Sequence, residues 1–367
     1  MRIVIDGRMY KESGIGRYIR NLITNLQSLD KYNEYYILQL KADYDTLVYH
    51  NNFKKVLTDF KWYGVKEQIE LPGILNNLKA DIVHFPHFNV PIFYKGKFVV
   101  TIHDLIHQHF QMKRATTLDP IAYRFKQFGY KKVFINSVVN SKKILVPSEY
   151  VKQTLIREWK VDERKIAVTP EAVDDKLFTT HFTRKMKKFG IERPYIFYVG
   201  NAHPHKNIEG LIKSFLALKE KNKDLQLVLS GHNNYFWQKI KSENNFEGII
   251  YTGEVTDEEL VSLYKNAKVF VMPSYEEGFG IPILEAMVCS CPVVSSDAGS
   301  LKEVGGNAAV YFDPKDQGNM VDKIDMVLNS EKIQKALIEK GKKRVKLFSW
   351  EKFAKQTLEV YQKCVLQ

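Results

Sequence analysis

Short apolar stretches alternate along this chain with segments of helical periodicity, and the alternation starts twice. In the first half, the stretches that predict strands are Arg2–Asp6, Tyr35–Leu40, Asp81–Phe85, Phe98–Ile102, Lys143–Pro147 and Ile166–Thr169. In the second half, they are Tyr195–Gly200, Leu225–Gly231, Ile249–Gly253, Val269–Met272, Pro292–Ser296 and Ala309–Phe312. Strands that alternate with helices form parallel sheets with helices on both faces, so we expect an α/β protein with two such sheets.

The chain is longer than one hydrophobic core usually requires. Its 367 residues predict two domains. The segment Lys176–Arg193 is rich in lysine and arginine and has little apolar pattern, so we place the linker near Pro170–Phe178. The first domain is then expected over residues 1–170 and the second over 171–349, with residues 350–367 as a separate amphipathic helix.

Composition narrows the classes of partner and compartment. The formal charge of +13 predicts attraction to anions such as nucleotide diphosphates, lipid heads or nucleic acid, with a generally basic proteome as the alternative explanation. No nucleic-acid module is recognisable, so we expect no nucleic acid as partner. The sparse cysteines, Cys289, Cys291 and Cys364, fit a reducing compartment. No apolar run suits a signal peptide or a membrane span, so we expect a cytoplasmic protein with only peripheral membrane contact.

Two carboxylates follow one predicted strand of the second half and flank a helix start. Gly278 and Gly280 give the loop a permissive backbone, and Pro282 suits the first turn of a helix. Glu277 then lies in the loop and Glu285 about one turn inside the helix, near its positive end. A helix start behind a glycine loop binds anions. Carboxylates beside such a site suit the neutral hydroxyls of a sugar or ribose.

Other polar residues also follow predicted strands. The whole set is Gly14, Gly16, His103, Asp104, Asn201, His203, His205, Lys206, Glu276, Glu277 and Gly278. Ligands of open parallel sheets bind beyond the carboxyl ends of the strands, so this set predicts a cleft between two facing α/β domains. Lys206 would supply a fixed positive charge for a phosphate, or be an ordinary solvated lysine. His103 would hydrogen-bond a substrate, or satisfy a backbone group. Gly14 and Gly16, in a loop predicted over Gly7–Arg17, would allow close backbone approach, or mark a plain turn.

Histidines gather in the first half without forming a convincing metal site. They are His84, His87, His103, His107 and His109. Apart from Asp104, no carboxylate-and-histidine set accompanies them, and they lie in strand and loop context rather than on a clear helix. Cys289 and Cys291 have no second pair of ligands. We therefore expect no metal.

Basic and aromatic residues interleave between positions 113 and 143. The basic residues are Lys113, Arg114, Arg124, Lys126, Lys131, Lys132, Lys142 and Lys143, and the aromatic residues are Tyr123, Phe125, Phe128, Tyr130 and Phe134. A basic amphipathic segment is typical of a surface that contacts an anionic membrane. The alternative is a solvated face that covers core aromatics.

The segment from Glu277 to Glu285, Glu-Gly-Phe-Gly-Ile-Pro-Ile-Leu-Glu, resembles the Glu-x7-Glu motif of the retaining glycosyltransferases of family 4. Those enzymes have the GT-B fold, in which two Rossmann-like domains face each other. Weaker landmarks of the family follow one another along nearly the whole chain: Ile5–Tyr10, Gly14–Tyr18, His103–Asp104, Val146–Glu149, Pro170–Asp174, Gly200–Asn207 and Ser300–Val304.

The resemblance implies roles for the residues at matching positions. Glu277 would hold hydroxyls of the donor sugar, Glu285 would hold the ribose, and Lys206 would neutralise the leaving diphosphate. His103 would lie beside the anomeric centre, which makes His103, Lys206 and Glu277 the implied catalytic residues. The implied donor-binding residues are Gly14, Gly16, Asn201, His205, Lys206, Glu277, Gly278, Phe279, Gly280 and Glu285. The first domain would bind the acceptor and the second the nucleotide sugar, and the helix from Trp350 onward would pack back on the first domain.

Two positions depart from the family pattern. Asn201 and His205 stand where related sequences often carry arginine. One fewer permanent cation would weaken stabilisation of the leaving group unless His205, another basic residue or a helix dipole substitutes for it.

The resemblance implies metal-independent transfer of a hexose, with retained anomeric configuration, to a hydroxyl of a glycan or polyprenyl-linked acceptor in cell-surface polysaccharide synthesis. The nucleotide-diphosphate sugar is a substrate, so no cofactor is implied. Similarity to bacterial polysaccharide and lipopolysaccharide mannosyltransferases makes GDP-mannose the first choice of donor, with UDP-sugars as the alternative. Other GT-B activities, such as a nucleotide-sugar epimerase or a phosphorylase, and a non-catalytic nucleotide-sugar or membrane binder complete the alternatives.

Overall fold

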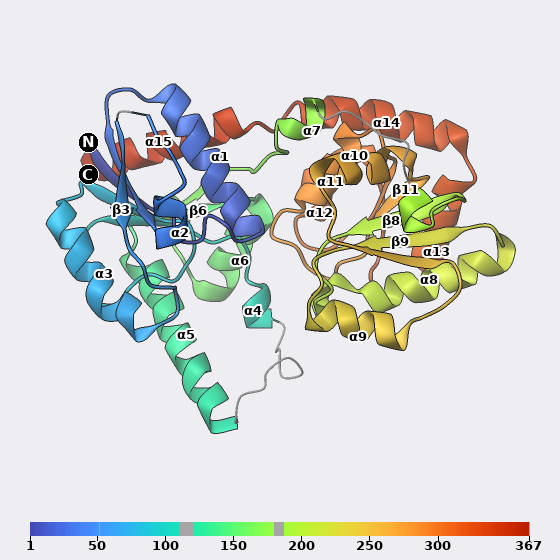
Figure 1. The fold of residues 1–367 in the computed structure, drawn as a ribbon, viewed down its shortest axis with the longest axis horizontal. Helices are drawn as coiled ribbons and strands as arrows, with labels where there is room; N and C mark the ends of the chain where they lie inside the picture. The colour runs from blue at the N-terminus through green and yellow to red at the C-terminus, as the bar shows by residue number, and fades with distance from the viewer. Residues whose placement is uncertain (51, 110–119, 180–186, 367) are drawn as a thin grey trace. The chain divides into compact units, whose positions relative to one another are not determined.

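The computed structural model of the protein describes residues 1–50, 52–109, 120–179 and 187–366. It divides into two compact units, each of which is described by itself. Unit 1 comprises Met1–Glu171 and Trp350–Gln367, and unit 2 comprises Ala172–Ser349. Figure 1 shows the last helix, in red, beside the blue helix α1, which it contacts. The end of the chain therefore returns to the unit in which the chain begins.

Unit 1 is built on a parallel sheet. The strands described are β1 (Arg2–Asp6), β2 (Glu34–Gln39), β3 (Phe53–Leu57), β4 (Ile82–Phe85), β5 (Phe98–Thr101), β6 (Lys143–Val146) and β7 (Ile166–Val168). Their order across the sheet is β3-β2-β1-β4-β5-β6-β7, and every neighbouring pair runs parallel.

Helices cover both faces of this sheet. They are α1 (Gly14–Leu29), α2 (Lys41–Tyr44), α3 (Val65–Leu78), α4 (Ile106–His109), α5 (Pro120–Asn140), α6 (Glu149–Trp159) and α15 (Trp350–Leu366). Because successive side chains of a strand point to opposite faces, Val83 and Val100 enter a core formed with α3, α5 and α6. Their neighbours His84 and Thr101 bond to side chains of α15 and α1 on the other face.

Unit 2 has the same alternation of parallel strands and helices. Its strands are β8 (Tyr195–Val199), β9 (Gln226–Ser230), β10 (Ile249–Gly253), β11 (Val269–Met272), β12 (Val293–Ser296) and β13 (Ala309–Phe312). The order is β10-β9-β8-β11-β12-β13, again parallel throughout. Its helices are α7 (Lys176–Thr179), α8 (Ile208–Lys221), α9 (Tyr235–Glu243), α10 (Asp257–Asn266), α11 (Ile281–Val288), α12 (Leu301–Gly305), α13 (Gln317–Leu328) and α14 (Glu331–Val345).

In both sheets, the order in which successive strands are added reverses at the first strand. In unit 1, β1 lies between β2 and β4, and in unit 2, β8 lies between β9 and β11. The chain therefore winds outward from β1 and β8 in one direction and later returns to wind in the other. Connections diverge at such a point and leave a crevice beyond the carboxyl ends of the two strands. In unit 2, this places the loops after β8 and β11 side by side.

Three features differ from the sequence-based expectations. Strand β3 (Phe53–Leu57) was not predicted, because Lys54 and Lys55 interrupt its apolar pattern at the edge of the sheet. Helix α1 begins at Gly14, so Gly14 and Gly16 lie in its first turn and not in the preceding loop. Asparagine commonly caps helices, so from the sequence Asn207 is expected to cap the helix that follows it. Asn207 does stand before α8, but its φ is 55° and its side chain donates to the carbonyls of two prolines and not to the helix.

Candidate functional site

The loop between β11 and α11 brings a carboxylate onto a lysine from the neighbouring loop. Lys206 Nζ donates to Glu277 Oε1 at 2.7 Å, and Ser274 Oγ donates to the same oxygen at 2.6 Å. The pair is largely enclosed, with side-chain exposures of 16% for Lys206 and 9% for Glu277. The two residues meet because β8 and β11 are adjacent in the sheet.

The backbone at Glu277 is held from the side of β12. Ser300 Oγ donates to the carbonyl of Glu277 at 3.0 Å and to that of Phe279 at 2.8 Å. Gly299 has a φ of +61°, and a Cβ added there would lie 2.7 Å from the nitrogen of Glu277 and 2.6 Å from its oxygen. Only glycine permits this close approach of two backbones. The position of Glu277 is therefore fixed by its surroundings and not only by its own loop.

Glu285 lies in α11, as the motif predicts, and is 3% exposed. Tyr264, on α10, donates its hydroxyl to Glu285 Oε2 at 2.9 Å. Burial, reinforced by the charge of Glu285, raises the pKa of Tyr264 well above its ordinary value, so the phenol keeps its proton and remains a donor. The second carboxylate of the motif is thus oriented by a tyrosine that sequence reasoning did not single out.

The start of α11 has the features expected of an anion-binding helix end. Gly280 precedes the helix with a φ of +99°, and Pro282 occupies its first turn. A Cβ at Gly280 would lie 2.6 Å from a methyl of Leu301, so this glycine is required for packing as well as for its backbone conformation. Gly278 and Phe279 are buried, and the ring of Phe279 packs edge-on against Phe348 at 5.7 Å.

The loop after β8 carries the other predicted donor-side residues. The rings of His203 and His205 stack with centroids 5.8 Å apart, and His203 also packs against Phe236. The carbonyl of Asn201 accepts the hydroxyl of Tyr198 at 2.8 Å. Neither Asn201 nor His205 supplies the permanent cation of an arginine, so in this loop Lys206 is the residue with a fixed positive charge.

In unit 1, His103 follows β5 and is held through both ring nitrogens. Nδ1 lies 3.1 Å from Glu171 Oε1, and Nε2 lies 2.9 Å from the carbonyl oxygen of Pro86. Burial acts to lower the pKa of His103, but Glu171 first, then the Pro86 carbonyl and Asp104, outweigh it and raise the pKa above its ordinary value. Glu171 was noted from the sequence only as part of a family landmark.

A buried hydrogen-bonded chain runs beside His103. Tyr361 of α15 bonds His84 Nδ1 at 2.5 Å, His84 Nε2 bonds Thr101 at 2.8 Å, and Thr101 bonds Tyr18 at 2.7 Å. The ring of Tyr18 then meets that of His103 edge-on, with centroids 4.8 Å apart. Burial, followed by the effect of His103, lowers the pKa of His84 to about 3, so His84 is neutral.

The sequence also suggests His87, His107 and His109 as possible metal ligands. His87 Nδ1 lies 2.9 Å from Asn89 Oδ1 and 3.3 Å from the hydroxyl of Tyr63. The side chains of His107 and His109 lie outside the part that the structure describes. Among the residues it does describe, no group of three or more histidine, cysteine or acidic side chains is arranged to hold a metal ion.

Gly14 and Gly16 have different surroundings. Gly14 is exposed, and a Cβ there would meet nothing within 4 Å. A Cβ at Gly16 would lie 2.5 Å from the carbonyl oxygen of Tyr10 and 3.0 Å from that of Met9. Gly16 therefore allows helix α1 to start against the turn that precedes it, and this packing accounts for the glycine without a ligand.

Sequence reasoning missed a buried ionic cluster beyond β1. Arg8 is 1% exposed and bonds Asp6 Oδ2 and Glu67 Oε1, each at 2.6 Å. Asn89 donates to Glu67 Oε1 at 2.8 Å. Burial raises the pKa of Glu67 in spite of Arg8. The cluster ties the loop after β1 to the start of α3 and to the loop after β4. The one feature of the sequence that could have indicated this cluster is Arg8 itself, an arginine two residues after the end of β1.

The described part of the predicted basic segment, residues 113–143, contains both buried core residues and exposed surface residues. Phe134 is 1% exposed and joins the core, whereas Phe128 is 60% exposed with Lys132 Nζ 4.6 Å from its ring centroid. Lys113 and Arg114 fall outside the described residues, as do the side chains of positions 120–127. None of the helices described is long and apolar enough to span a bilayer.

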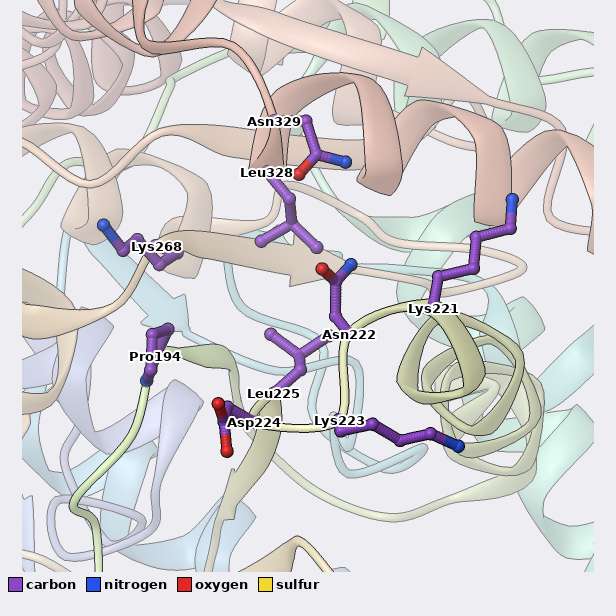
Figure 2. Close-up of a pocket in the computed structure, with 9 residues that line it drawn as sticks. All are labelled: Pro194, Lys221, Asn222, Lys223, Asp224, Leu225, Lys268, Leu328 and Asn329. Carbon is purple, nitrogen blue, oxygen red and sulfur yellow. The ribbon is translucent and has the colours of Figure 1, made fainter.

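A surface pocket of about 430 Å³ lies at the opposite end of the unit 2 sheet. It is lined by Pro194, Lys221, Asn222, Lys223, Asp224, Leu225, Lys268, Leu328 and Asn329. Three of these, Pro194, Leu225 and Lys268, directly precede strands, so the pocket is at the amino ends of the strands. Figure 2 shows the side chain of Lys268 pointing to one side of the pocket and those of Lys221 and Lys223 to the other. The pocket is thus separate from the predicted donor site.

Comparison with known proteins covers both units. The family model described as Glycosyltransferase Family 4 matches residues 13–177, and that described as Glycosyl transferases group 1 matches residues 181–344. The chain is 31% identical over 296 residues to O-antigen chain mannosyltransferase B of Escherichia coli, across 78% of this chain and 75% of that protein. It is 25% identical over 319 residues to O-antigen chain mannosyltransferase RfbU of Salmonella typhimurium, across 83% and 84%.

Solved structures resemble the chain along its whole length. Sucrose-phosphate synthase from Thermosynechococcus elongatus superimposes with a TM-score of 0.76 over 99% of this chain and 98% of that one. At 19% sequence identity, this similarity concerns the fold.

Proposed function

Because the chain belongs to glycosyltransferase family 4 and has the GT-B fold, we propose that it transfers a hexosyl group from a nucleotide-diphosphate sugar to a hydroxyl of a glycan or lipid-linked acceptor. The observation that carries the proposal is the contact between Lys206 and Glu277 at the switch point of the unit 2 sheet, beside the start of α11. A cation, a helix start and a carboxylate together suit a molecule that joins a diphosphate to a polyhydroxylated ring.

Each part of the donor has a matching group in unit 2. The ammonium of Lys206 has three N–H donors, so it can bind a phosphate oxygen while one donor stays on Glu277. Glu277 accepts hydrogen bonds from sugar hydroxyls, and Glu285, held by Tyr264, accepts from the ribose. The buried backbone from Gly278 to Gly280 lies between these carboxylates and faces the sugar and phosphates.

The proposed reaction retains the anomeric configuration. The bond between the anomeric carbon and the leaving phosphate oxygen breaks while the acceptor oxygen forms a new bond on the same face, and the acceptor proton passes to the leaving phosphate. No side chain acts as nucleophile in this scheme. Lys206 and the start of α11 stabilise the growing charge of the diphosphate. His205 and the helix dipole take over from the missing arginine at position 201. The scheme needs no metal, so EDTA leaves activity unchanged.

GDP-mannose is the proposed donor, because two relatives that align over most of their length are named as O-antigen mannosyltransferases. Those names also support a role in cell-surface polysaccharide synthesis.

The proposed location is the cytoplasm, with peripheral attachment to an anionic membrane through the α5 face around Phe128 and Lys132. Salt-sensitive flotation with anionic liposomes tests the attachment, and loss of it in a Lys131→Glu, Lys132→Glu variant assigns it to α5.

Donor identity is tested first by binding and then by chemistry. A ligand that binds only the folded state raises its apparent stability, so a thermal-shift panel of GDP- and UDP-sugars ranks the donors. The donor that binds is then incubated with a polyprenyl-linked glycan, and the product's anomeric configuration is read by NMR. A retained configuration supports the proposed route. Full transfer activity in folded Lys206→Ala and Glu277→Ala variants would overturn the assigned site.

A further inference from the structure

His103 has no ring nitrogen left to accept a proton. Nε2 faces the carbonyl oxygen of Pro86 at 2.9 Å, and Nδ1 faces Glu171 Oε1 at 3.1 Å. A carbonyl oxygen can only accept a hydrogen bond, so Nε2 must carry a hydrogen. An ionised carboxylate also only accepts, so Nδ1 carries a second hydrogen whenever Glu171 is charged. A ring with both hydrogens is an imidazolium.

The groups around the ring favour this charged form. Glu171 and Asp104 supply the two carboxylates that face it. Tyr18 packs edge-on from α1, and burial raises its pKa, so it brings no charge. His84, on β4, is neutral because burial lowers its pKa to about 3. The net charge of the groups around His103 is therefore negative. A hydrogen-bonded carboxylate partner favours the charged form of an enclosed histidine.

We propose that Glu171 is a positioning residue that holds His103 as a doubly protonated imidazolium, so that His103 acts on the substrate as a fixed cation and not as a proton acceptor. This inference rests on the proposed function for its catalytic consequence. The side chain of His103 is 18% exposed, and with both nitrogens bonded to protein it offers solvent only polarised C–H groups and positive charge. Such a group stabilises the negative charge that grows on the leaving diphosphate but cannot activate the acceptor hydroxyl.

The charge state is measured directly by NMR of the full-length protein labelled with 15N-histidine. The two ring nitrogens of His103, assigned by loss of their signals in His103→Asn, should both be protonated at pH 7. The Glu171→Gln variant keeps the size and hydrogen-bonding capacity of the side chain but removes its charge. We expect the pKa of His103 to fall by about 1 unit or more in this variant. The exposed Glu163, in the short 3-10 helix that precedes β7, gives the matched control Glu163→Gln, which should leave the titration unchanged.

Two results would overturn the inference: a neutral ring with one protonated nitrogen at pH 7 in the wild-type protein, or an unchanged pKa in Glu171→Gln. Thermal unfolding confirms that the variants fold, and Glu171→Asp, which keeps the charge, should recover part of the pKa shift. These readouts need no turnover. If no nucleotide sugar supports transfer by the wild-type protein, the proposed function fails while the titration still decides the state of His103.

The role in turnover is read from the pH profile of kcat with the donor that binds best. In the wild-type enzyme, activity falls as His103 loses its proton. In Glu171→Gln, this alkaline limb of the kcat profile moves to lower pH by the same interval as the NMR titration. KM for the donor changes by less than about twofold. An effect on kcat without an effect on KM indicates that His103 acts in the transition state and not in ground-state binding. A purely structural role of Glu171 would lower kcat equally at every pH, and that outcome would also overturn the proposal.

Discussion

The ammonium of Lys206 and the carboxylate of Glu277 lie 2.7 Å apart, although 71 residues separate them in the chain. The contact depends on strands β8 and β11 being neighbours. It couples the group proposed to stabilise the leaving diphosphate to the group proposed to hold the sugar. Neither residue can be changed without altering the surroundings of the other.

Replacing Lys206 by alanine should therefore lower both activity and stability. Loss of a preorganised charge at the leaving group costs on the order of 100-fold in kcat. Glu277, which is largely enclosed, would also lose its cation, at a cost of about 2 kcal/mol in the free energy of unfolding. Steady-state kinetics and urea unfolding measure the two effects. Lys213, exposed on α8, provides the control Lys213→Ala, which should match the wild-type protein in both. A Lys206→Ala enzyme with wild-type kcat would contradict the assignment.

The hydroxyl of Tyr264 is expected to set the affinity for the donor. Tyr264→Phe removes the hydroxyl that donates to Glu285 at 2.9 Å and also lies 3.4 Å from the carbonyl oxygen of Pro282. The carboxylate proposed to bind the ribose then loses its orientation. We expect KM for the donor to rise about tenfold, which corresponds to about 1.4 kcal/mol, with a smaller change in kcat. The control is Tyr195→Phe. Tyr195 is also buried and bonds the carbonyl of Leu263, but it lies at the amino end of β8. An equal rise in KM in both variants would point to general loosening of unit 2.

The sequence places each functional residue on an element but does not say which elements are neighbours. Lys206 and Glu277 were both predicted at the ends of strands, and the motif alone gave the spacing to Glu285. Their contact follows from the pairing of β8 with β11, which are separated in the chain by two strands and three α-helices. Pairing of this kind depends on long-range packing, which periodicity does not record.

Glu171 shows why the rest of the site escaped prediction. From the sequence it lies in a presumed linker, where an acidic residue is unremarkable. Its role follows only when the ends of β7 and β5 come near each other with β6 between them, which brings Glu171 to His103. Arg8 was missed for a similar reason, since its partner Glu67 comes from α3. The local sequence does not show which distant residue such a side chain contacts.

Gly299 should be indispensable for placing Glu277. Alanine at this position would face two penalties: a left-handed backbone conformation and contacts of 2.6 and 2.7 Å with the backbone of Glu277. Gly253 is a matched control, because it has a similar φ of +71° but nothing within 4 Å of an added Cβ. Gly253→Ala should lose about 1 to 2 kcal/mol of stability from the backbone conformation alone. Gly299→Ala should lose clearly more in urea unfolding and should also lose transfer activity. Equal losses of stability would show that the contact with Glu277 imposes no constraint.

The buried His84 predicts a pH dependence of stability with a definite sign. In the folded protein the pKa of His84 is lowered to about 3, whereas the unfolded chain binds this proton near its ordinary value. Below that value the unfolded state takes up a proton that the folded state refuses, so stability falls as the pH falls. His103 has a raised pKa and acts in the opposite direction, so the comparison must be made against a His84→Asn variant. Between about pH 6.5 and pH 5, the wild-type protein should lose about 2 kcal/mol more than His84→Asn, as measured by urea unfolding. The exposed His50 supplies the control His50→Asn, which should follow the wild-type protein, and parallel curves for all three proteins would refute the neutral state of His84.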